Sequence, residues 1–415
     1  MDARAVIVGA GHSGGKAAQA LRKRGWTGPI TLVGDESQPP YDRPPLSKAV
    51  LLGKKSVGSC LFRPDEWYRE QSIDLILERK VTAIDRQRKC IVLDDEQCIS
   101  YDCLLIATGA EPNPLPIPGA NLPGVSAFRT ADDATRVSSY LNPGTQVVIV
   151  GAGFIGLEVA AAAVEKGCVV TVLEMASAPL GRVLPKIVAS ALTEIHSQRG
   201  VMFRFGVSVA EIEGIERVEA VRLATGERVS CDHVVYGVGA RPRTFLAEEA
   251  GLHVSNGIRV DSSLRTTDPD IYACGDVCSY YSARYKQDLR LESWKNAEDQ
   301  ADLAARSMLG HETSYDELPW FWSNQYEVAL QVAGLPTLGS ITISRPAGRG
   351  VLFFSLDESG VLMGVCGLGP IPDIAVPVRL LKAWIDSGVH LCVDRLTDVT
   401  IPLTDARNFE LAAAS

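Results

Sequence analysis

A glycine-rich phrase that follows a short apolar run occurs twice in this chain, and it constrains the fold more than any other feature. The first copy follows Ala5–Val8 and the second follows Val147–Val150. The glycines are Gly9, Gly11 and Gly14 in the first copy, and Gly151, Gly153 and Gly156 in the second. Both copies have the spacing G-x-G-x-x-G between a predicted strand and a predicted helix, which is typical of a site for the pyrophosphate of a dinucleotide.

Each glycine in this pattern has a separate physical role. The first permits the tight turn that leaves the strand, the second lets the backbone approach a pyrophosphate, and the third lets helix and strand pack closely. The helix that follows presents unpaired N–H groups and the positive end of its dipole to the phosphates. Two such sites in one chain indicate electron transfer between two dinucleotides, and therefore a flavoprotein that is fed by a pyridine nucleotide.

Each glycine phrase and its predicted helix are followed by another apolar run, and an acidic residue stands at the end of that run. Such an acid accepts hydrogen bonds from the ribose hydroxyls of the adenosine. In the first copy Asp35 aligns best, although Glu36 could serve. In the second copy the acid is Glu174, whose negative charge would repel a 2′-phosphate, so NADH is expected in preference to NADPH.

Composition excludes several other classes of protein. Apolar residues make up 46% of the chain and charged residues 22%, as in an ordinary globular protein, and a net charge of −9 gives no sign of nucleic-acid binding. The 10 cysteines are scattered with no C-x-x-C pair, which indicates reduced thiols. No segment has the pattern of a signal peptide or a membrane span. We therefore expect a cytoplasmic protein with no membrane partner and no bound metal.

Six further segments resemble a known family. Three of them, Leu104–Gly109, Tyr236–Pro242 and Ile271–Val277, resemble segments of the two-dinucleotide flavoprotein reductases in the pyridine nucleotide-disulfide oxidoreductase superfamily. The other three resemble the FAD-dependent ferredoxin reductases that serve oxygenases, the family of putidaredoxin reductase and of the reductases of biphenyl-type dioxygenases. These three are Tyr41–Lys48, Leu291–Ala297 and Pro319–Tyr326.

The resemblance, which runs from about Arg4 to about Leu335, implies an α/β fold. Two Rossmann-like dinucleotide-binding domains of the glutathione-reductase kind would be followed by a small C-terminal α+β domain. The expected ranges are 1–113 and 244–317 for the FAD-binding domain, 114–243 for the NADH-binding domain and 318–415 for the C-terminal domain. In the last of these, residue periodicity predicts strands near Gly339–Ser344 and Gly350–Ser355 and a helix near Val376–Ser387.

The resemblance also implies which residues contact each cofactor. Those expected at FAD, besides the first glycine phrase, are Ser13, Asp35, Arg43, Lys48, Val81, Thr108, Gly109, Arg129, Asp276 and Trp294. Those expected at NADH, besides the second glycine phrase, are Ile155, Glu158, Glu174 and Gly239, with Arg182 as a weaker candidate. Trp322 is expected to contact the flavin ring or the nicotinamide, and a place in the core is its alternative.

Lys48 and Glu158 are expected to form the catalytic pair. Lys48 would donate a hydrogen bond close to the flavin N5 and favour the reduced ring, while Glu158 would hold Lys48 and contact the nicotinamide. The alternatives are a solvated lysine at a helix end and a buried ion pair that only stabilises the fold. His12, inside the first glycine phrase, is expected to pack rather than to bind a ligand.

The cysteines argue against a disulfide reductase. Related enzymes with that activity need a dithiol beside the flavin, with one sulfur held as a low-pKa thiolate. The corresponding stretch in this chain, Arg43–Leu52, contains no cysteine. Cys98 and Cys103 have a C-x4-C spacing, but they stand just before the Leu104–Ile106 run, which is the wrong context.

Without a dithiol, electrons must leave the flavin directly, and a flavin can release them singly to an iron–sulfur partner. This chain has no iron–sulfur ligand spacing, so the cluster belongs to another protein. The resemblance implies an NADH:ferredoxin reductase whose acceptor is a 2Fe–2S ferredoxin, or a rubredoxin, that feeds a mono- or dioxygenase. An NADH oxidase and a redox-sensing NADH-binding flavoprotein are the alternatives. Candidates for a basic docking patch are Arg284, Lys286, Arg290 and Lys295.

Overall fold

The computed structural model describes residues 3–407, and the chain divides into two compact units. Unit 1 comprises Met1–Pro45, Lys55–Glu111 and Ala240–Glu317, and unit 2 comprises Leu46–Lys54, Pro112–Gly239 and Leu318–Ser415. The short segment Leu46–Lys54 therefore belongs to unit 2, although its neighbours in the sequence belong to unit 1. The expected domain boundaries, including the one between an NADH-binding and a C-terminal domain, stay predictions.

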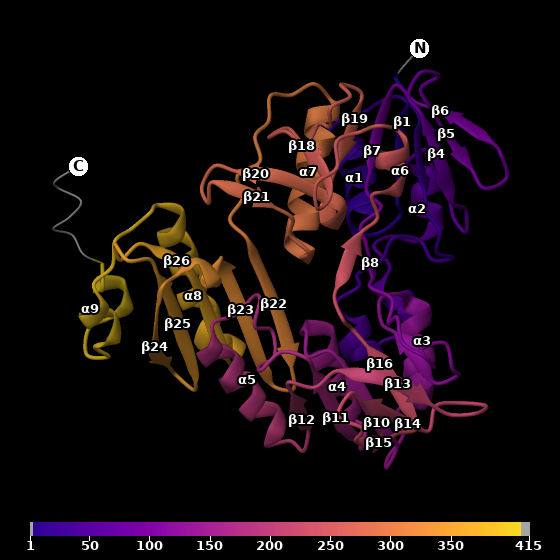
Figure 1. The fold of residues 1–415 in the computed structure, drawn as a ribbon. Helices are drawn as coiled ribbons and strands as arrows, with labels where there is room; N and C mark the ends of the chain where they lie inside the picture. The colour runs from indigo at the N-terminus through magenta and orange to yellow at the C-terminus, as the bar shows by residue number, and fades with distance from the viewer. Residues whose placement is uncertain (1–2, 408–415) are drawn as a thin grey trace. The chain divides into compact units, whose positions relative to one another are not determined.

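A five-stranded parallel sheet forms the centre of unit 1 (Figure 1). Its strands, in sheet order, are β19 (Ile271–Ala273), β7 (Cys103–Ile106), β1 (Ala5–Val8), β2 (Ile30–Val33) and β3 (Ile73–Ile76). All four residues of β1 are buried, as expected for the central strand of a parallel sheet. Helices α1 (His12–Lys23) and α7 (Trp294–Met308) pack against each other and against strands of this sheet.

Smaller elements complete unit 1. One antiparallel sheet contains β4 (Val81–Asp85), β5 (Cys90–Leu93) and β6 (Cys98–Ser100), and a second three-stranded sheet contains β18 (Ile258–Val260), β20 (Cys278–Ser282) and β21 (Gln287–Leu289). The short helices are α2 (Asp65–Glu70) and α6 (Phe245–Glu249). Where the chain leaves and re-enters the unit, β8 (Ala110–Pro112) pairs with β17 (Ala240–Pro242).

Unit 2 contains a second five-stranded parallel sheet. Its strands, in sheet order, are β12 (Met202–Phe205), β11 (Val169–Glu174), β10 (Gln146–Val150), β16 (His233–Tyr236) and β9 (Val125–Ala127). The helices of this part are α3 (Ala131–Tyr140), α4 (Phe154–Glu165) and α5 (Lys186–Ser197). An antiparallel sheet of β13 (Val209–Glu213), β14 (Ala220–Leu223) and β15 (Arg228–Ser230) follows. Two parallel sheets of this kind confirm the predicted fold class.

The C-terminal part of unit 2 is an antiparallel sheet with a helix packed on it. The strands, in sheet order, are β22 (Trp320–Gln325), β23 (Val328–Gly334), β26 (Leu362–Gly369), β25 (Gly350–Leu356) and β24 (Ile341–Ala347), and the helices are α8 (Ile371–Asp386) and α9 (Val393–Thr397). The two expected strands are confirmed as β24 and β25.

The helix expected near Val376–Ser387 begins earlier than predicted, at Ile371. Pro370 occupies the cap position and Pro372 lies in the first turn, where N–H groups have no partner within the helix, so proline is tolerated there. Pro377 lies inside the helix, where its missing N–H removes one backbone hydrogen bond.

Within residues 3–407, none of the helices is both long and apolar enough to cross a membrane. The same residues contain no group of three or more His, Cys, Asp or Glu side chains arranged to hold a metal ion.

Candidate functional site

The first glycine phrase forms a tight loop between β1 and α1 in unit 1. Gly9 has a φ of 110°, and a Cβ there would lie 2.3 Å from the backbone oxygen of Ala107. A Cβ on Gly14 would lie 1.9 Å from the oxygen of Gly9, so both positions require glycine. At Gly11, by contrast, a Cβ would meet only the Arg43 guanidinium, at 3.8 Å. The loop is therefore closed on its strand side and open at Gly11, as a pyrophosphate site requires.

Several of the residues expected at FAD lie at one edge of the parallel sheet in unit 1. Gly9, Asp35 and Thr108 follow the carboxyl ends of β1, β2 and β7, and Asp276 follows β19 through Gly275. Because the carboxyl ends of parallel strands share an edge, these residues meet there. A close contact agrees with this, because a Cβ on Gly275, next to Asp276, would lie only 2.2 Å from the hydroxyl oxygen of Ser13 at the start of α1.

The two acids after β2 have different basic partners. Glu36 accepts hydrogen bonds from the Tyr41 hydroxyl and from Arg43, each at 2.5 Å. Asp35 pairs with Arg243 at 2.7 Å. Burial raises the pKa of the Asp35 carboxyl, but the hydrogen bond and charge of Arg243 outweigh it and hold that pKa below its usual value. Both acids are therefore placed near the first glycine loop, and the choice between them stays open.

Trp294 and His12 pack together at the start of α1. The indole N–H of Trp294 donates to Asp42 at 2.8 Å, and its ring centre lies 4.9 Å from that of the His12 imidazole. The ring of Phe62 lies at the same distance from the imidazole. Burial, together with the charges of Lys16 and Arg43, lowers the pKa of His12 to about 3. His12 is therefore a neutral residue packed among rings, as predicted.

The remaining residues expected at FAD are spread over both units. Val81 begins β4, and Thr108 donates to the backbone oxygen of Arg243 at 2.9 Å, with Gly109 next in the chain at a φ of 67°. Arg129 belongs to unit 2, where its N–H donates to Asp133 at 3.0 Å. The cofactor roles of these four residues stay predictions.

The second glycine phrase repeats this geometry in unit 2, between β10 and α4. Gly151 has a φ of 103°, and a Cβ there would lie 2.4 Å from the oxygen of Gly237. A Cβ on Gly156 would lie 2.1 Å from the oxygen of Gly151, whereas the nearest atom to one on Gly153 would be 3.9 Å away. The second loop is thus also closed toward its strand and open at its middle glycine.

The other residues expected at NADH surround this second loop. Glu174 ends β11, and its carboxylate accepts from the N–H of Ala152 in the loop and from that of Ala176, each at 2.7 Å. Gly239 follows β16, and a Cβ there would lie 3.7 Å from the Arg182 guanidinium. Ile155 is exposed in the first turn of α4. Arg182, the weaker candidate, therefore lies near Gly239.

An ion pair joins the half-buried Lys48 to the buried Glu158 in unit 2. Lys48 lies on η1 (Leu46–Val50), which packs on α4, and its Nζ is 2.7 Å from the Glu158 carboxylate. Only 5% of the Glu158 side chain is exposed, and 22% of the Lys48 side chain. The hydroxyls of Ser47 and Ser323 donate to the same carboxylate at 2.5 Å and 2.6 Å. The expected pairing is confirmed, while the catalytic roles stay predictions.

Ser47 and Ser323 were not expected at this site. Their sequence signal was their position, because each stands next to a residue already singled out, Lys48 or Trp322. Trp322 itself lies on β22, half-buried, with its ring 5.1 Å from that of Trp320.

One consequence of this part of unit 2 is a pH dependence of stability at His196, which is fully buried on α5. Burial lowers the pKa of His196 to about 4, although a hydrogen bond to Gln325 opposes the shift. Since the unfolded chain has the higher pKa of about 6.5, it binds the proton first as the pH falls. This residue then costs about 1.4 kcal/mol of stability per pH unit between about pH 6.5 and 4, and nothing above that range.

Urea unfolding at pH 7.5 and pH 5 measures this effect. The free energy of unfolding should fall by about 2 kcal/mol from His196 alone, and His196→Gln should lose less stability over the same interval. An equal loss in both proteins would contradict the assignment.

Wherever the pKa of a thiol is shifted within residues 3–407, it is raised, whereas a redox dithiol needs a lowered one. Burial raises the pKa of Cys274 to about 12, and it also raises the pKa of Cys103 above its usual value. Cys98 is exposed at the start of β6, whereas Cys103 begins β7. All 10 cysteines are free thiols in the structure.

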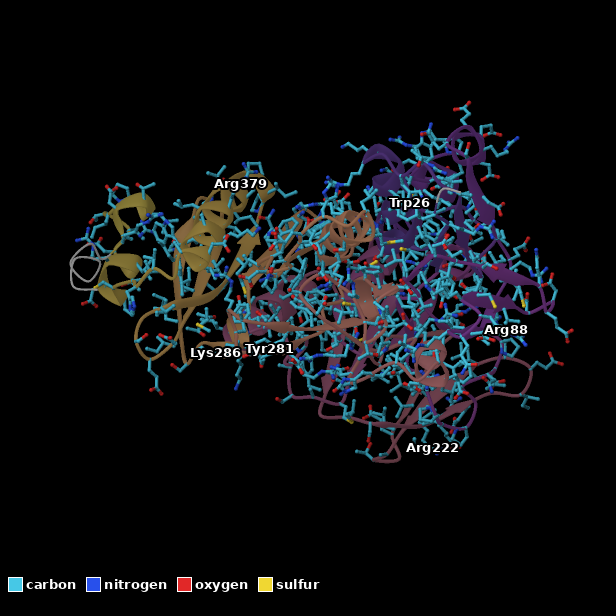
Figure 2. The ribbon with its side chains drawn as sticks, turned by 90° about the horizontal axis from the view of Figure 1, so that it is seen from above. Trp26, Arg88, Arg222, Tyr281, Lys286 and Arg379 are labelled. Atoms are coloured by element: carbon cyan, nitrogen blue, oxygen red, sulfur yellow. The ribbon has the colours of Figure 1, made fainter. Side chains whose placement is uncertain are left out.

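The expected basic docking patch does not form as a set of free charges. Arg290 pairs with Glu292 at 2.6 Å and also donates to the backbone oxygen of Asp276, and Lys295 pairs with Asp299 one turn along α7. Lys286 is exposed on the β20–β21 hairpin, as is Tyr281 (Figure 2). Acids two and four residues further along the chain therefore neutralise two of the four proposed positions.

Comparison with known proteins agrees with this geometry. The family described as pyridine nucleotide-disulphide oxidoreductase matches residues 3–301, and the one described as reductase C-terminal matches residues 320–407. A probable ferredoxin reductase, CtmF, from Castellaniella defragrans is 42% identical over 401 residues, or 96% of this chain and 98% of that protein. The ferredoxin–NAD(+) reductase component of the anthranilate 1,2-dioxygenase system from Burkholderia cepacia is 39% identical, over 96% of this chain and 98% of that protein.

A solved structure gives the same result. The crystal structure of a covalent putidaredoxin reductase–putidaredoxin complex matches with a TM-score of 0.93 at 35% identity, covering 100% of this chain and 99% of that one. The chain belongs to the pyridine nucleotide-disulphide oxidoreductase family, whose members bind FAD and NAD(H). Within that family, its resemblance to the ferredoxin reductases of oxygenase systems is confirmed.

The residues present fit two dinucleotides. Each glycine loop leads into a helix whose N-cap residue is a glycine, Gly11 or Gly153. In the described part of the chain no side chain caps either helix, so the backbone N–H groups of the first turn remain for phosphate oxygens. In both cases an acid stands at the end of the neighbouring strand or just after it, as ribose hydroxyls require.

Proposed function

We propose that this chain is an FAD-dependent NADH:ferredoxin reductase that passes electrons from NADH, one at a time, to a 2Fe–2S ferredoxin serving a mono- or dioxygenase. The observation that carries the proposal is the ion pair between Lys48 and the buried Glu158, because Lys48 stands in the stretch Arg43–Leu52, which contains no cysteine. A charge pair can orient and polarise a cofactor, but it cannot form a disulfide with a substrate. Bound FAD supplies the step between a two-electron donor and a one-electron acceptor.

The residues of unit 1 are proposed to hold FAD. The first glycine loop and the start of α1 bind the pyrophosphate, Asp35 or Glu36 binds the adenosine ribose, and Asp276 binds the flavin side chain. Ser13, Arg43, Val81, Thr108, Gly109 and Trp294 complete the contacts. Arg129 is a further proposed contact of FAD. Arg43 suits a phosphate contact because it stays charged. Burial lowers the pKa of Arg43, but the effect of the neighbouring Tyr41 and Glu36 is larger and leaves that pKa above its usual value.

The residues of unit 2 are proposed to bind NADH and to promote the reduction of the flavin by NADH. The second glycine loop binds the pyrophosphate, while Glu174, Gly239 and Ile155 contact the adenosine and the ribose. Lys48 donates a hydrogen bond near the flavin N5, and Glu158 fixes Lys48 and contacts the nicotinamide. Trp322 contacts the flavin ring or the nicotinamide.

The scattered free thiols support a place in the cytoplasm.

Steady-state turnover tests the proposed reaction. With NADH and a 2Fe–2S ferredoxin from an oxygenase system, we expect cluster reduction at about 1 to 1000 turnovers per second, with little oxygen uptake when the ferredoxin is left out. Oxygen uptake that is equally fast without ferredoxin would identify an NADH oxidase. Slow turnover with ferredoxin and with rubredoxin alike would point to a redox sensor.

Glu174 is expected to set the choice of NADH over NADPH. In Glu174→Arg the carboxylate that would repel a 2′-phosphate is replaced by a group that attracts it, so the ratio of kcat/KM for NADPH to that for NADH should rise at least about tenfold. Glu174→Gln is the matched control, because it removes the charge yet keeps an oxygen for the N–H groups of Ala152 and Ala176. An unchanged ratio in the arginine variant would place the adenosine ribose elsewhere.

A further inference from the structure

A chain of hydrogen-bonded side chains leads away from Glu158 through the interior of unit 2. Ser323 donates to Glu158 at 2.6 Å, and the amide of Gln325 contacts the Ser323 oxygen at 3.0 Å. The other end of that amide lies 2.5 Å from Nε2 of His196, and Nδ1 of His196 lies 3.1 Å from the Tyr326 hydroxyl. Ser323, Gln325 and His196 are each at most 3% exposed.

The donors and acceptors in this chain can be assigned from Glu158 outward. A carboxylate only accepts, so the Ser323 hydroxyl must donate to it and is left to accept from the Gln325 amide nitrogen. The Gln325 carbonyl oxygen then faces His196, whose Nε2 must carry a proton and donate. Because His196 is neutral in its buried setting, Nδ1 is the acceptor for Tyr326. Every donor therefore points toward Glu158.

The outer end of the chain is held in a conformation that costs energy. Tyr326 has a φ of 57° in the two-residue turn between β22 and β23, where glycine is the usual residue. The guanidinium of Arg199 lies 4.4 Å from the centre of its ring, and Arg199 also pairs with Glu327, the other residue of the turn. A cavity of about 550 Å³ opens here, lined by Lys54, Val164, Glu165, Arg199, Tyr326 and Glu327.

We propose that His196 is a positioning residue for Glu158, and that it acts through Gln325 and Ser323 by fixing the direction of their hydrogen bonds. This inference rests on the role proposed above for Glu158. With the donor at His196 Nε2 in place, the Gln325 amide has one orientation, and the Ser323 hydroxyl is committed to the Glu158 carboxylate. Without that donor, the amide can turn its oxygen to Ser323, whose hydroxyl then donates to Gln325 instead.

Loss of the Ser323 hydrogen bond leaves the negative charge of Glu158 less compensated. A more negative carboxylate beside Lys48 disfavours the electron-rich, reduced form of the bound flavin. The equilibrium constant for flavin reduction should therefore fall about tenfold, the size expected for one charge-assisted hydrogen bond. For a two-electron couple that change lowers the midpoint potential by about 30 mV.

A double-mutant cycle on the FAD-loaded protein tests the inference, with the midpoint potential as readout. His196→Leu and Ser323→Ala should each lower the midpoint potential by about 30 mV, which corresponds to a tenfold change in the equilibrium constant. The double variant should lower it no further, since both substitutions remove the same hydrogen bond. His196→Gln keeps a donor that can reach Gln325 and should stay within about twofold of the wild-type constant. His196→Phe removes the same donor but keeps a ring against Phe203 and Tyr326, and it replaces His196→Leu if that variant does not fold.

Two outcomes would overturn the inference. Additive effects of His196→Leu and Ser323→Ala would mean that the two residues act separately, and equal shifts in His196→Leu and His196→Gln would reduce His196 to a packing residue. Tyr326→Phe is the matched control, because it removes the outermost donor and leaves the inner bonds intact, so no shift is expected.

Glu158→Gln separates this inference from the proposed function. If Glu158→Gln changes the potential and His196→Leu does not, only the role of His196 fails. If Glu158→Gln leaves both the potential and the reduction by NADH unchanged, the proposed role of Glu158 fails and the inference fails with it. A readout independent of the flavin is the ¹⁵N NMR spectrum of His196 in the whole protein, which should show the tautomer protonated at Nε2. The tautomer protonated at Nδ1 would contradict the direction of the chain.

Discussion

Replacing Gly156 with alanine should greatly weaken NADH binding while FAD stays in place. The new Cβ would lie 2.1 Å from the backbone oxygen of Gly151, and no side-chain movement can relieve a clash with backbone. The loop between β10 and α4 must open, which moves the N–H groups proposed for the pyrophosphate. We expect the affinity for NADH to fall at least about 100-fold, or ~2.7 kcal/mol. Titration of the oxidised protein with NAD(H) analogues measures it, and the flavin-to-protein absorbance ratio reports FAD.

Gly14→Ala is the counterpart in the other loop. Its Cβ would lie 1.9 Å from the oxygen of Gly9, so this variant should lose FAD instead. Gly58→Ala is the control, because a Cβ there has its nearest neighbour 4.0 Å away, at the Ser56 hydroxyl. If Gly156→Ala bound NADH normally, or lost FAD as Gly14→Ala should, the assignment of the two loops would be wrong.

Replacing Lys48 with methionine should slow the reduction of the flavin by NADH about 100-fold, equivalent to ~2.7 kcal/mol in the barrier. Methionine keeps the length of the side chain but removes the cation that lies 2.7 Å from Glu158. The carboxylate, almost fully buried, is then left with two serine donors. We also expect a loss of about 1 to 3 kcal/mol in stability, less than for a fully buried pair because Lys48 retains contact with solvent. Stopped-flow absorbance under anaerobic conditions measures the rate.

Lys54→Met is the matched control for this variant. Lys54 belongs to the same short segment of unit 2, but its partner Glu165 is 3.4 Å away and its side chain is 66% exposed. Exposed pairs of this kind contribute little, so neither the rate nor the stability should change appreciably. A Lys48→Met protein that is reduced as fast as the wild type would leave the ion pair with a structural role only.

The parts of the structure that the sequence predicted best are those set by local backbone rules. Gly9 and Gly14 are needed because a Cβ would collide with backbone a few residues away, and this requirement is visible as a spacing of glycines. Glu174 ends β11, which pairs directly with β10, the strand before the second glycine loop. The position of Glu174 beside that loop therefore follows from the order of strands and turns. Such features depend on short stretches of chain.

The parts that could not be predicted depend on contacts between distant segments. Ser47, Glu158 and Ser323 come from three separate stretches and meet only because η1 and β22 both pack on α4. The basic patch was weakened for the opposite reason, because Arg290 and Lys295 pair with Glu292 and Asp299, which are near in the sequence, and its role in docking stays a prediction.

The central claim is that electrons leave this protein directly from the flavin, without a thiol intermediate. An anaerobic titration of the FAD-loaded protein with NADH, followed by addition of an oxidised 2Fe–2S ferredoxin, tests it most directly. We expect the flavin absorbance to bleach in one step that consumes two electrons per FAD, and to return rapidly when ferredoxin is added. A titration in two steps that consumes four electrons, with a long-wavelength thiolate–flavin band, would reveal a redox disulfide and contradict the account.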